Sequence, residues 1–153
     1  GTQTWHYKMP VPHSTYLVSF VIGKYALVKE NYKNIPLGYY IYPGRESTAR
    51  NAYDRTTDMF ALFEKLTGVE FPFNKYDQTM VANFQFGGME NITATTMADT
   101  EIFFADIGFG KNAVMDLVSH ELAHSWFGIM VTCRNWAELW LNEVFATFME
   151  AVY

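Results

Sequence analysis

The sequence predicts an α+β fold in which a mixed β-sheet packs against helices. In the first third of the chain, short apolar runs alternate with turn residues, which predicts strands at 16–22, 25–28 and 37–42 separated by Gly23 and by the loop before 37. In later segments, apolar residues recur every three or four positions, which is typical of amphipathic helices. Together the two patterns favour a sheet followed and covered by helices.

The middle of the chain predicts one helix and two further strands. A helix is expected over 48–66, with apolar side chains at helical spacing: Met59, Phe60, Leu62, Phe63 and Leu66. Gly68 is placed to end it, because glycine readily adopts the left-handed conformation at a helix C-terminus. Strands follow at about 76–82 and 92–97. The aromatic stripe of this helix is interpreted as core, since amphipathic packing explains it.

Two helices are expected in the last third. The first follows two glycines, is capped by Asn112 and runs to about Phe127. The second begins at Asn135, whose side chain caps it, with Glu138 three residues on completing a pair like a capping box. Apolar residues lie on several sides of this last helix, so we expect it to be packed on more than one face.

Composition narrows the class of protein. The chain has 153 residues, half of them apolar and 18% aromatic, which is enough to bury a sizeable core. The net charge of −5, without a basic stripe, argues against a nucleic-acid partner, and no apolar run is long enough for a transmembrane segment. Cys133 is the only cysteine, which excludes an intrachain disulfide and a cysteine-rich metal site. The cellular compartment stays open.

The run His120-Glu121-Leu122-Ala123-His124 carries the clearest chemical signal. On a helix, the two histidines fall on one face a turn apart and can reach the same ion, while Glu121 is rotated beside them. Glu143, on the following helix, is a suitable third ligand. Three protein ligands leave a position open for water, as in catalytic zinc sites. The alternative is a solvated helix face that carries two histidines by accident.

This spacing resembles the gluzincin metallopeptidases, and the run Gly87-Gly88-Met89-Glu90-Asn91 narrows the resemblance to zinc aminopeptidases of the aminopeptidase N type. The resemblance implies a thermolysin-like lobe with one Zn²⁺ held by His120, His124 and Glu143. It implies that Glu121 is the catalytic general base. It also implies substrate binding by Gly87, Gly88, Met89, Glu90 and Asn91, with Glu90 on the free α-ammonium. Without it, the glycines would suggest a hairpin or bulge and Glu90 a solvated acid.

The function that the resemblance implies is hydrolysis of the amino-terminal peptide bond of peptides with a free N-terminus. The nucleophile would be a zinc-bound water activated by Glu121. One alternative is an isolated or engineered zinc-binding fragment with little or no turnover. Another is an endopeptidase with the same chemistry, which a free-amine role of Glu90 disfavours.

Several features depart from the family pattern. We expect a single domain over 1–153, truncated relative to the family, with 1–104 mainly sheet plus one helix and 105–153 two zinc-binding helices. The family's transition-state tyrosine would lie beyond Tyr153. Ile129 stands where Asp or Asn is usual, and Val144 where Gly is usual. Val144 either crowds the two zinc helices or stabilises the final helix. Exposed apolar surface would favour self-association.

Overall fold

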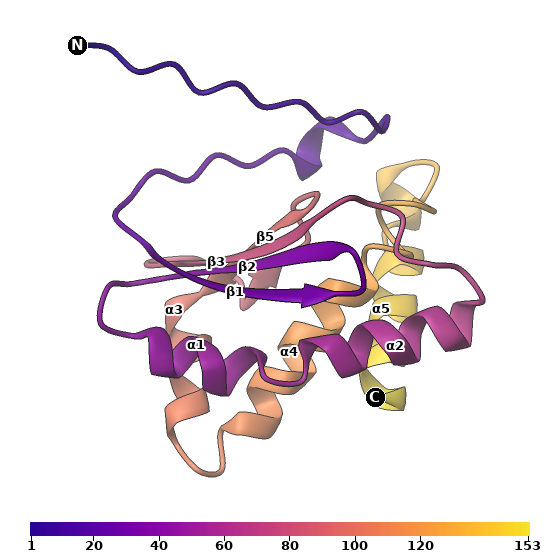
Figure 1. Cartoon of the computed structure of the whole chain (residues 1–153). Coiled ribbons are helices and arrows are strands. Elements are labelled where there is room, and N and C mark those ends of the chain that lie inside the picture. The colour runs from indigo at the N-terminus through magenta and orange to yellow at the C-terminus, as the bar shows by residue number, and fades with distance from the viewer.

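The computed structural model describes residues 1–153, and its centre is a five-stranded mixed sheet (Figure 1). The strand order is β1-β2-β3-β5-β4, with β1 and β4 at the edges. Neighbouring strands are parallel in the β2–β3 and β3–β5 pairs and antiparallel in the β1–β2 and β4–β5 pairs. The strands are β1 (Ala26–Tyr32), β2 (Ile35–Ile41), β3 (Tyr76–Val81), β4 (Gly88–Met89) and β5 (Ala94–Ala98).

Helices α1, α2 and α4 lie below the sheet in Figure 1, and α5 stands beside them. The α-helices are α1 (Glu46–Tyr53), α2 (Thr56–Thr67), α3 (Asp99–Ile102), α4 (Lys111–Ala123) and α5 (Trp140–Val152). Short 3₁₀ turns occur at Thr15–Leu17, Phe103–Asp106 and Trp136–Glu138. No helix has the length and apolar character needed to cross a membrane. The prediction of an α+β fold with a mixed sheet and packed helices is confirmed.

The core forms where the helices meet the sheet. Buried and half-buried residues alternate along β3, as expected for a strand with one face against helices, whereas β2 buries Leu37, Gly38 and Tyr39 in succession. Phe60 of α2 is fully buried, and its ring packs against Tyr32, Phe71, Tyr76 and Trp126. The interpretation of the α2 aromatic residues as core is therefore confirmed for Phe60 and Phe63. Through Trp126, this cluster also holds the end of α4 in place.

The strand predicted at 16–22 is wrong. The chain instead makes a 3₁₀ turn over Thr15–Leu17 and then continues without regular structure. Leu17 is buried, whereas Val18, Phe20 and Ile22 are exposed. An apolar run becomes a strand only where a neighbouring strand pairs with its backbone, and 16–22 pairs with none of the five strands.

The helix predicted over 48–66 is two helices, α1 and α2, which are separated by a turn at Asp54 and Arg55. Buried residues continue at helical spacing through the break: Thr48, Ala49, Ala52, Tyr53, Thr56, Met59, Phe60 and Phe63. The periodic pattern of apolar residues therefore could not reveal the break between α1 and α2. The end at Gly68 is confirmed, because this residue has a φ of 69° and its N–H donates to the Glu64 carbonyl.

The predicted starts of the last two helices need correction. Asn112 does not cap α4, which starts at Lys111 after Gly110, where a Cβ would lie 2.5 Å from the Phe104 carbonyl oxygen. The same helix ends at Ala123, and tighter turns follow. The Asn135 side chain does accept a hydrogen bond, but from Ala137 at the start of a 3₁₀ turn. The α-helix itself begins only at Trp140.

Helix α5 buries one narrow face, so the prediction of packing on several faces is wrong. Its buried residues are Asn142, Ala146 and Met149, which lie at helical spacing against α4. Its larger apolar side chains are exposed: Trp140, Val144, Phe145, Phe148 and Val152. Together with Leu66 and Phe127, some of them line a shallow apolar groove. Self-association through this surface stays a prediction.

Truncating the central aromatic residue should destabilise the fold strongly. Phe60→Ala should lower the free energy of unfolding by about 3–5 kcal/mol, because it removes a fully buried ring and leaves a cavity. The matched control is Phe109→Ala, at an exposed ring, which should change stability by less than about 0.5 kcal/mol. Urea unfolding followed by circular dichroism measures both variants, and equal midpoints would contradict the role of Phe60.

Glu64 should make stability depend on pH. Burial opposes its charge, but hydrogen bonds from Lys33, the Phe71 N–H and Tyr32 outweigh burial and lower the pKa of Glu64. A pKa below the unfolded value of about 4.3 means that this stabilisation is present above that pH and lost as pH falls through the folded pKa.

Glu64→Gln should therefore cost roughly 1–3 kcal/mol at pH 7, the range for hydrogen bonds to a charged group. Its difference from the wild type should shrink on acidification from pH 6 to pH 3. Denaturant unfolding at several pH values measures this difference. A pH-independent gap would show that the charge of Glu64 is not the cause.

Candidate metal centre

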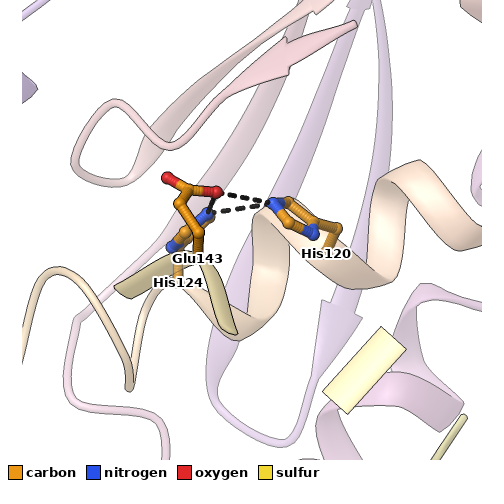
Figure 2. A group of neighbouring side chains, drawn as sticks. All are labelled: His120, His124 and Glu143. Atoms are coloured by element: carbon orange, nitrogen blue, oxygen red, sulfur yellow. Dashed lines mark hydrogen bonds and ion pairs between the residues drawn. The ribbon is translucent and has the colours of Figure 1, made fainter. Parts of the chain in front are cut away.

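Two helices bring three candidate ligand side chains together. His120 and His124 project from α4 and its C-terminal turn, and Glu143 projects from the first turn of α5 (Figure 2). The two histidine Nε2 atoms lie 3.1 Å apart. Glu143 Oε2 lies 3.4 Å from Nε2 of His120 and 3.6 Å from Nε2 of His124. The three atoms thus form a nearly equilateral triangle.

The size of this triangle fits a tetrahedral ion. Zinc binds histidine nitrogen and carboxylate oxygen at about 2.0–2.2 Å, so two ligands of a tetrahedral zinc are separated by about 3.3 Å. The three observed separations scatter about that value. The same three residues form one of two clusters in the chain whose potential ligand atoms all lie within 4.8 Å of one another.

Hydrogen bonds at the other ring nitrogens orient both imidazoles. His120 Nδ1 donates to Glu150 Oε2 at 3.0 Å, and His124 Nδ1 donates to the Phe127 carbonyl oxygen at 2.9 Å. Because both partners are acceptors, each neutral ring carries its proton on Nδ1 and presents the lone pair of Nε2. Two lone pairs and a carboxylate oxygen therefore point at one spot. A cation at that spot removes their mutual repulsion.

The charge states of the three residues reflect this convergence. Burial disfavours the charged form of His120 and His124, but the Glu143 carboxylate outweighs burial and raises the pKa of both. The two imidazoles in turn hold the pKa of Glu143 well below its usual range. Glu143 is therefore ionised at neutral pH, which is the form that binds a metal.

Glu121 lies beside the triangle in a nearly dry environment. Its residue is 5% exposed, and Oε2 is buried without a hydrogen-bond partner. Desolvation is the main cause that raises the pKa of Glu121 to about 8. Its side chain packs directly on Gly88, where a Cβ would lie 2.4 Å from Glu121 Oε1. A larger residue at position 88 would require Glu121 to move.

The run 87–91 forms the sheet edge next to these residues. Gly88 and Met89 make up β4, and the Gly87 carbonyl accepts a hydrogen bond from Ala98. Glu90 is 6% exposed and belongs to the second cluster, with Glu121 and His124. Asn91 is engaged within the fold, since its amide donates to the Leu17 carbonyl and its Oδ1 accepts from Thr96. Glu90 is thus the residue of this run that belongs to a cluster of potential metal ligands.

Three residues around the centre escaped the sequence reasoning. Glu150 orients His120, and its position seven residues after Glu143, two turns along α5, was a usable signal. Gly128 has a φ of 136°, and a Cβ there would lie 2.9 Å from His124 Nδ1, so this close approach requires glycine. Tyr16 hydrogen-bonds to Glu90 from a segment that was expected to be a strand.

The two residues that depart from the family pattern are close in the chain to candidate ligands, since Ile129 follows His124 by five residues and Val144 directly follows Glu143. Val144 is 52% exposed, which argues against the first of its two alternatives, crowding between α4 and α5. Ile129 packs against the core from the turn after α4, where its N–H donates to the His124 carbonyl.

The chain is similar to known proteins. The model of the peptidase family M1 domain matches residues 51–153, which include all of the residues above except Tyr16 and Leu17. Endoplasmic reticulum aminopeptidase 1 of Mus musculus is 35% identical over 151 residues, covering 96% of this chain and 16% of the mouse protein. Aminopeptidase N of Streptomyces lividans is 37% identical over 157 residues, covering 96% of this chain and 18% of that protein.

A third relative, the mitochondrial aminopeptidase 2 of Saccharomyces cerevisiae, is 37% identical over 139 residues, covering 89% of this chain and 15% of the yeast protein. The chain therefore spans about a sixth of the length of these curated relatives. Since the family model covers well over half of the chain, the chain belongs to peptidase family M1.

Proposed function

We propose that this chain carries the catalytic centre of a zinc-dependent aminopeptidase, which removes the amino-terminal residue from peptides. The observation that carries the proposal is the convergence of His120, His124 and Glu143 next to two further buried carboxylates, Glu121 and Glu90. The names of the M1 relatives, which are aminopeptidases, support the same class of reaction. We also infer that the sheet with α4 and α5 forms a thermolysin-like lobe.

His120, His124 and Glu143 would hold one Zn²⁺. The donor set of two neutral imidazoles and a carboxylate is one that catalytic zinc sites use, and the separations of these donor atoms fit it. Zinc supplies Lewis acidity, which polarises a substrate carbonyl and makes water a better nucleophile at neutral pH. Glu150 and the Phe127 carbonyl keep the two imidazoles turned toward the ion.

Glu121 would act as the general base. A base works best when its pKa lies near the working pH, and desolvation raises the pKa of Glu121 to about 8. Its Oε2 has no partner in the fold, so it can accept a proton from the attacking water. The protonated carboxyl can then deliver that proton to the departing amine, which completes the transfer on a single side chain.

Glu90 would set the direction of the substrate. A buried carboxylate near the ligand cluster attracts the α-ammonium of a free amino terminus more strongly than a solvated one would. Anchoring the ammonium there brings the first peptide carbonyl to the metal centre. The short edge strand β4 supports this reading, because an extended peptide can add to an unpaired strand edge.

Zinc binding should depend on the ligands and on Glu150. The wild type should hold one zinc per chain after dialysis, and His120→Ala should lose it. Glu150→Gln should weaken zinc binding by roughly 10–100-fold, the usual effect of losing a residue that orients a ligand. Glu138→Gln is the control, since Glu138 contacts Trp140 rather than a candidate ligand. Competition with a chromophoric chelator measures the affinity, and a zinc-free wild type would refute the metal site.

Activity should require both Glu121 and a free amine. The zinc-loaded chain should release the fluorophore from aminoacyl substrates and leave their N-acetylated counterparts intact. Glu121→Gln should lower the rate by about 10²–10⁴-fold with zinc content unchanged, because it removes the proton acceptor. Cleavage of acetylated peptides would instead indicate an endopeptidase. Zinc binding without cleavage of either substrate would leave a metal-binding fragment with no turnover.

A further inference from the structure

The 3₁₀ turn Thr15–Leu17 is docked onto the segment that carries Glu90. The Leu17 carbonyl accepts one hydrogen bond from the Ile92 N–H at 3.0 Å and another from the Asn91 side-chain amide at 3.3 Å. The Leu17 side chain is buried in the core. The backbone directly after Tyr16 is therefore tied to the two residues that follow Glu90.

This docking places the Tyr16 side chain between Glu90 and the loop before α5. The Tyr16 ring packs edge-on against Trp136, with ring centroids 4.8 Å apart. Its hydroxyl lies 3.5 Å from Glu90 Oε1. No other side chain or backbone group donates a hydrogen bond to the Glu90 carboxylate within the protein. The direction of the Glu90 carboxylate thus depends on the Tyr16 hydroxyl. Tyr16 in turn is held by the packing of its ring on Trp136 and by the docking of Leu17.

The surroundings of Glu90 make such a donor important. Glu90 is nearly buried and shares a cluster with another buried carboxylate, Glu121, and with His124. Burial, followed by the nearby charge of Glu90, raises the pKa of Tyr16 to about 12, so the hydroxyl keeps its proton and remains a donor at neutral pH.

We propose that Tyr16 is a positioning residue that holds Glu90 Oε1, so that the carboxylate faces the free amino group of a substrate. The proposal rests on the proposed aminopeptidase function, in which Glu90 binds the α-ammonium. With Oε1 held by the hydroxyl, Oε2 is left without a partner in the protein and is the oxygen available to the ligand. Tyr16 thereby gives the segment before the sheet a direct part in substrate selection.

The test uses the zinc-loaded chain and two small probes, leucine amide and N-acetyl-leucine amide, with binding measured by calorimetry. All variants are made in a Glu121→Gln parent, which lacks the proposed general base so that leucine amide is bound and not hydrolysed, and this parent serves as the wild-type reference. Tyr16→Phe keeps the ring and its packing on Trp136 but removes the hydroxyl. It should weaken leucine amide by roughly tenfold, because a misplaced anchoring group is costly, and leave the weak binding of the acetylated probe unchanged. Tyr7→Phe, at a 77% exposed ring of the same segment, is the control and should change neither.

A double-mutant cycle separates positioning from a general structural effect. In the Glu90→Gln background, adding Tyr16→Phe should cause no further loss of leucine amide binding. Three results would each overturn the role of Tyr16 and leave the proposed function standing. The first is additive losses of leucine amide affinity in the double variant, and the second is an equal loss of affinity for both probes in Tyr16→Phe. The third is unchanged binding of leucine amide in Tyr16→Phe while Glu90→Gln binds it weakly. Wild-type affinity in Glu90→Gln, or no wild-type binding of leucine amide, would overturn the amine-binding role of Glu90 and this proposal with it.

Discussion

The structure depends most on the packing of α5 against α4, because it forces three hydrogen-bond acceptors to face one another. His120 and His124 present lone pairs, and Glu143 presents a negative charge, all within 3.6 Å. Such a group is unfavourable by itself and favourable around a cation, so a bound cation would stabilise the helix pair. The narrow buried face of α5, with Asn142, Ala146 and Met149, sets the position of Glu143 relative to α4.

The aromatic core provides the rigid support that this arrangement needs. Trp126 follows the second histidine by two residues, and its ring is fully enclosed by Phe60, Phe63 and Phe71. Its Nε1 also donates to the Val69 carbonyl at 3.0 Å. The turn that follows α4 is therefore held both by the packing of the Trp126 ring and by the hydrogen bond of its Nε1. A metal centre with ligands on two helices needs this support, because a shift of half an ångström changes the geometry of the ligands.

Two carboxylates next to the same centre have different surroundings, which suits them to different tasks. Glu121 has a buried oxygen without a partner and a raised pKa, as a proton acceptor needs. Glu90 receives a hydrogen bond from Tyr16, as an anchor with a fixed direction needs. The difference arises from distant parts of the chain. Gly88 lets the sheet edge approach Glu121 closely, while a turn from the amino-terminal segment reaches Glu90.

By itself, the sequence determined the helix that carries His120 and Glu121, the apolar face of α2 and the helix end at Gly68. These follow from local spacing and from the backbone freedom of glycine, which do not need the rest of the fold. Tertiary structure decided that 16–22 is not a strand, that 48–66 is two helices and that most large apolar residues of α5 are exposed. It also decided that Glu150 and Tyr16 reach His120 and Glu90. These outcomes depend on which surfaces meet, because strand pairing, burial and long-range hydrogen bonds are properties of two segments together, whereas a periodic pattern describes only one.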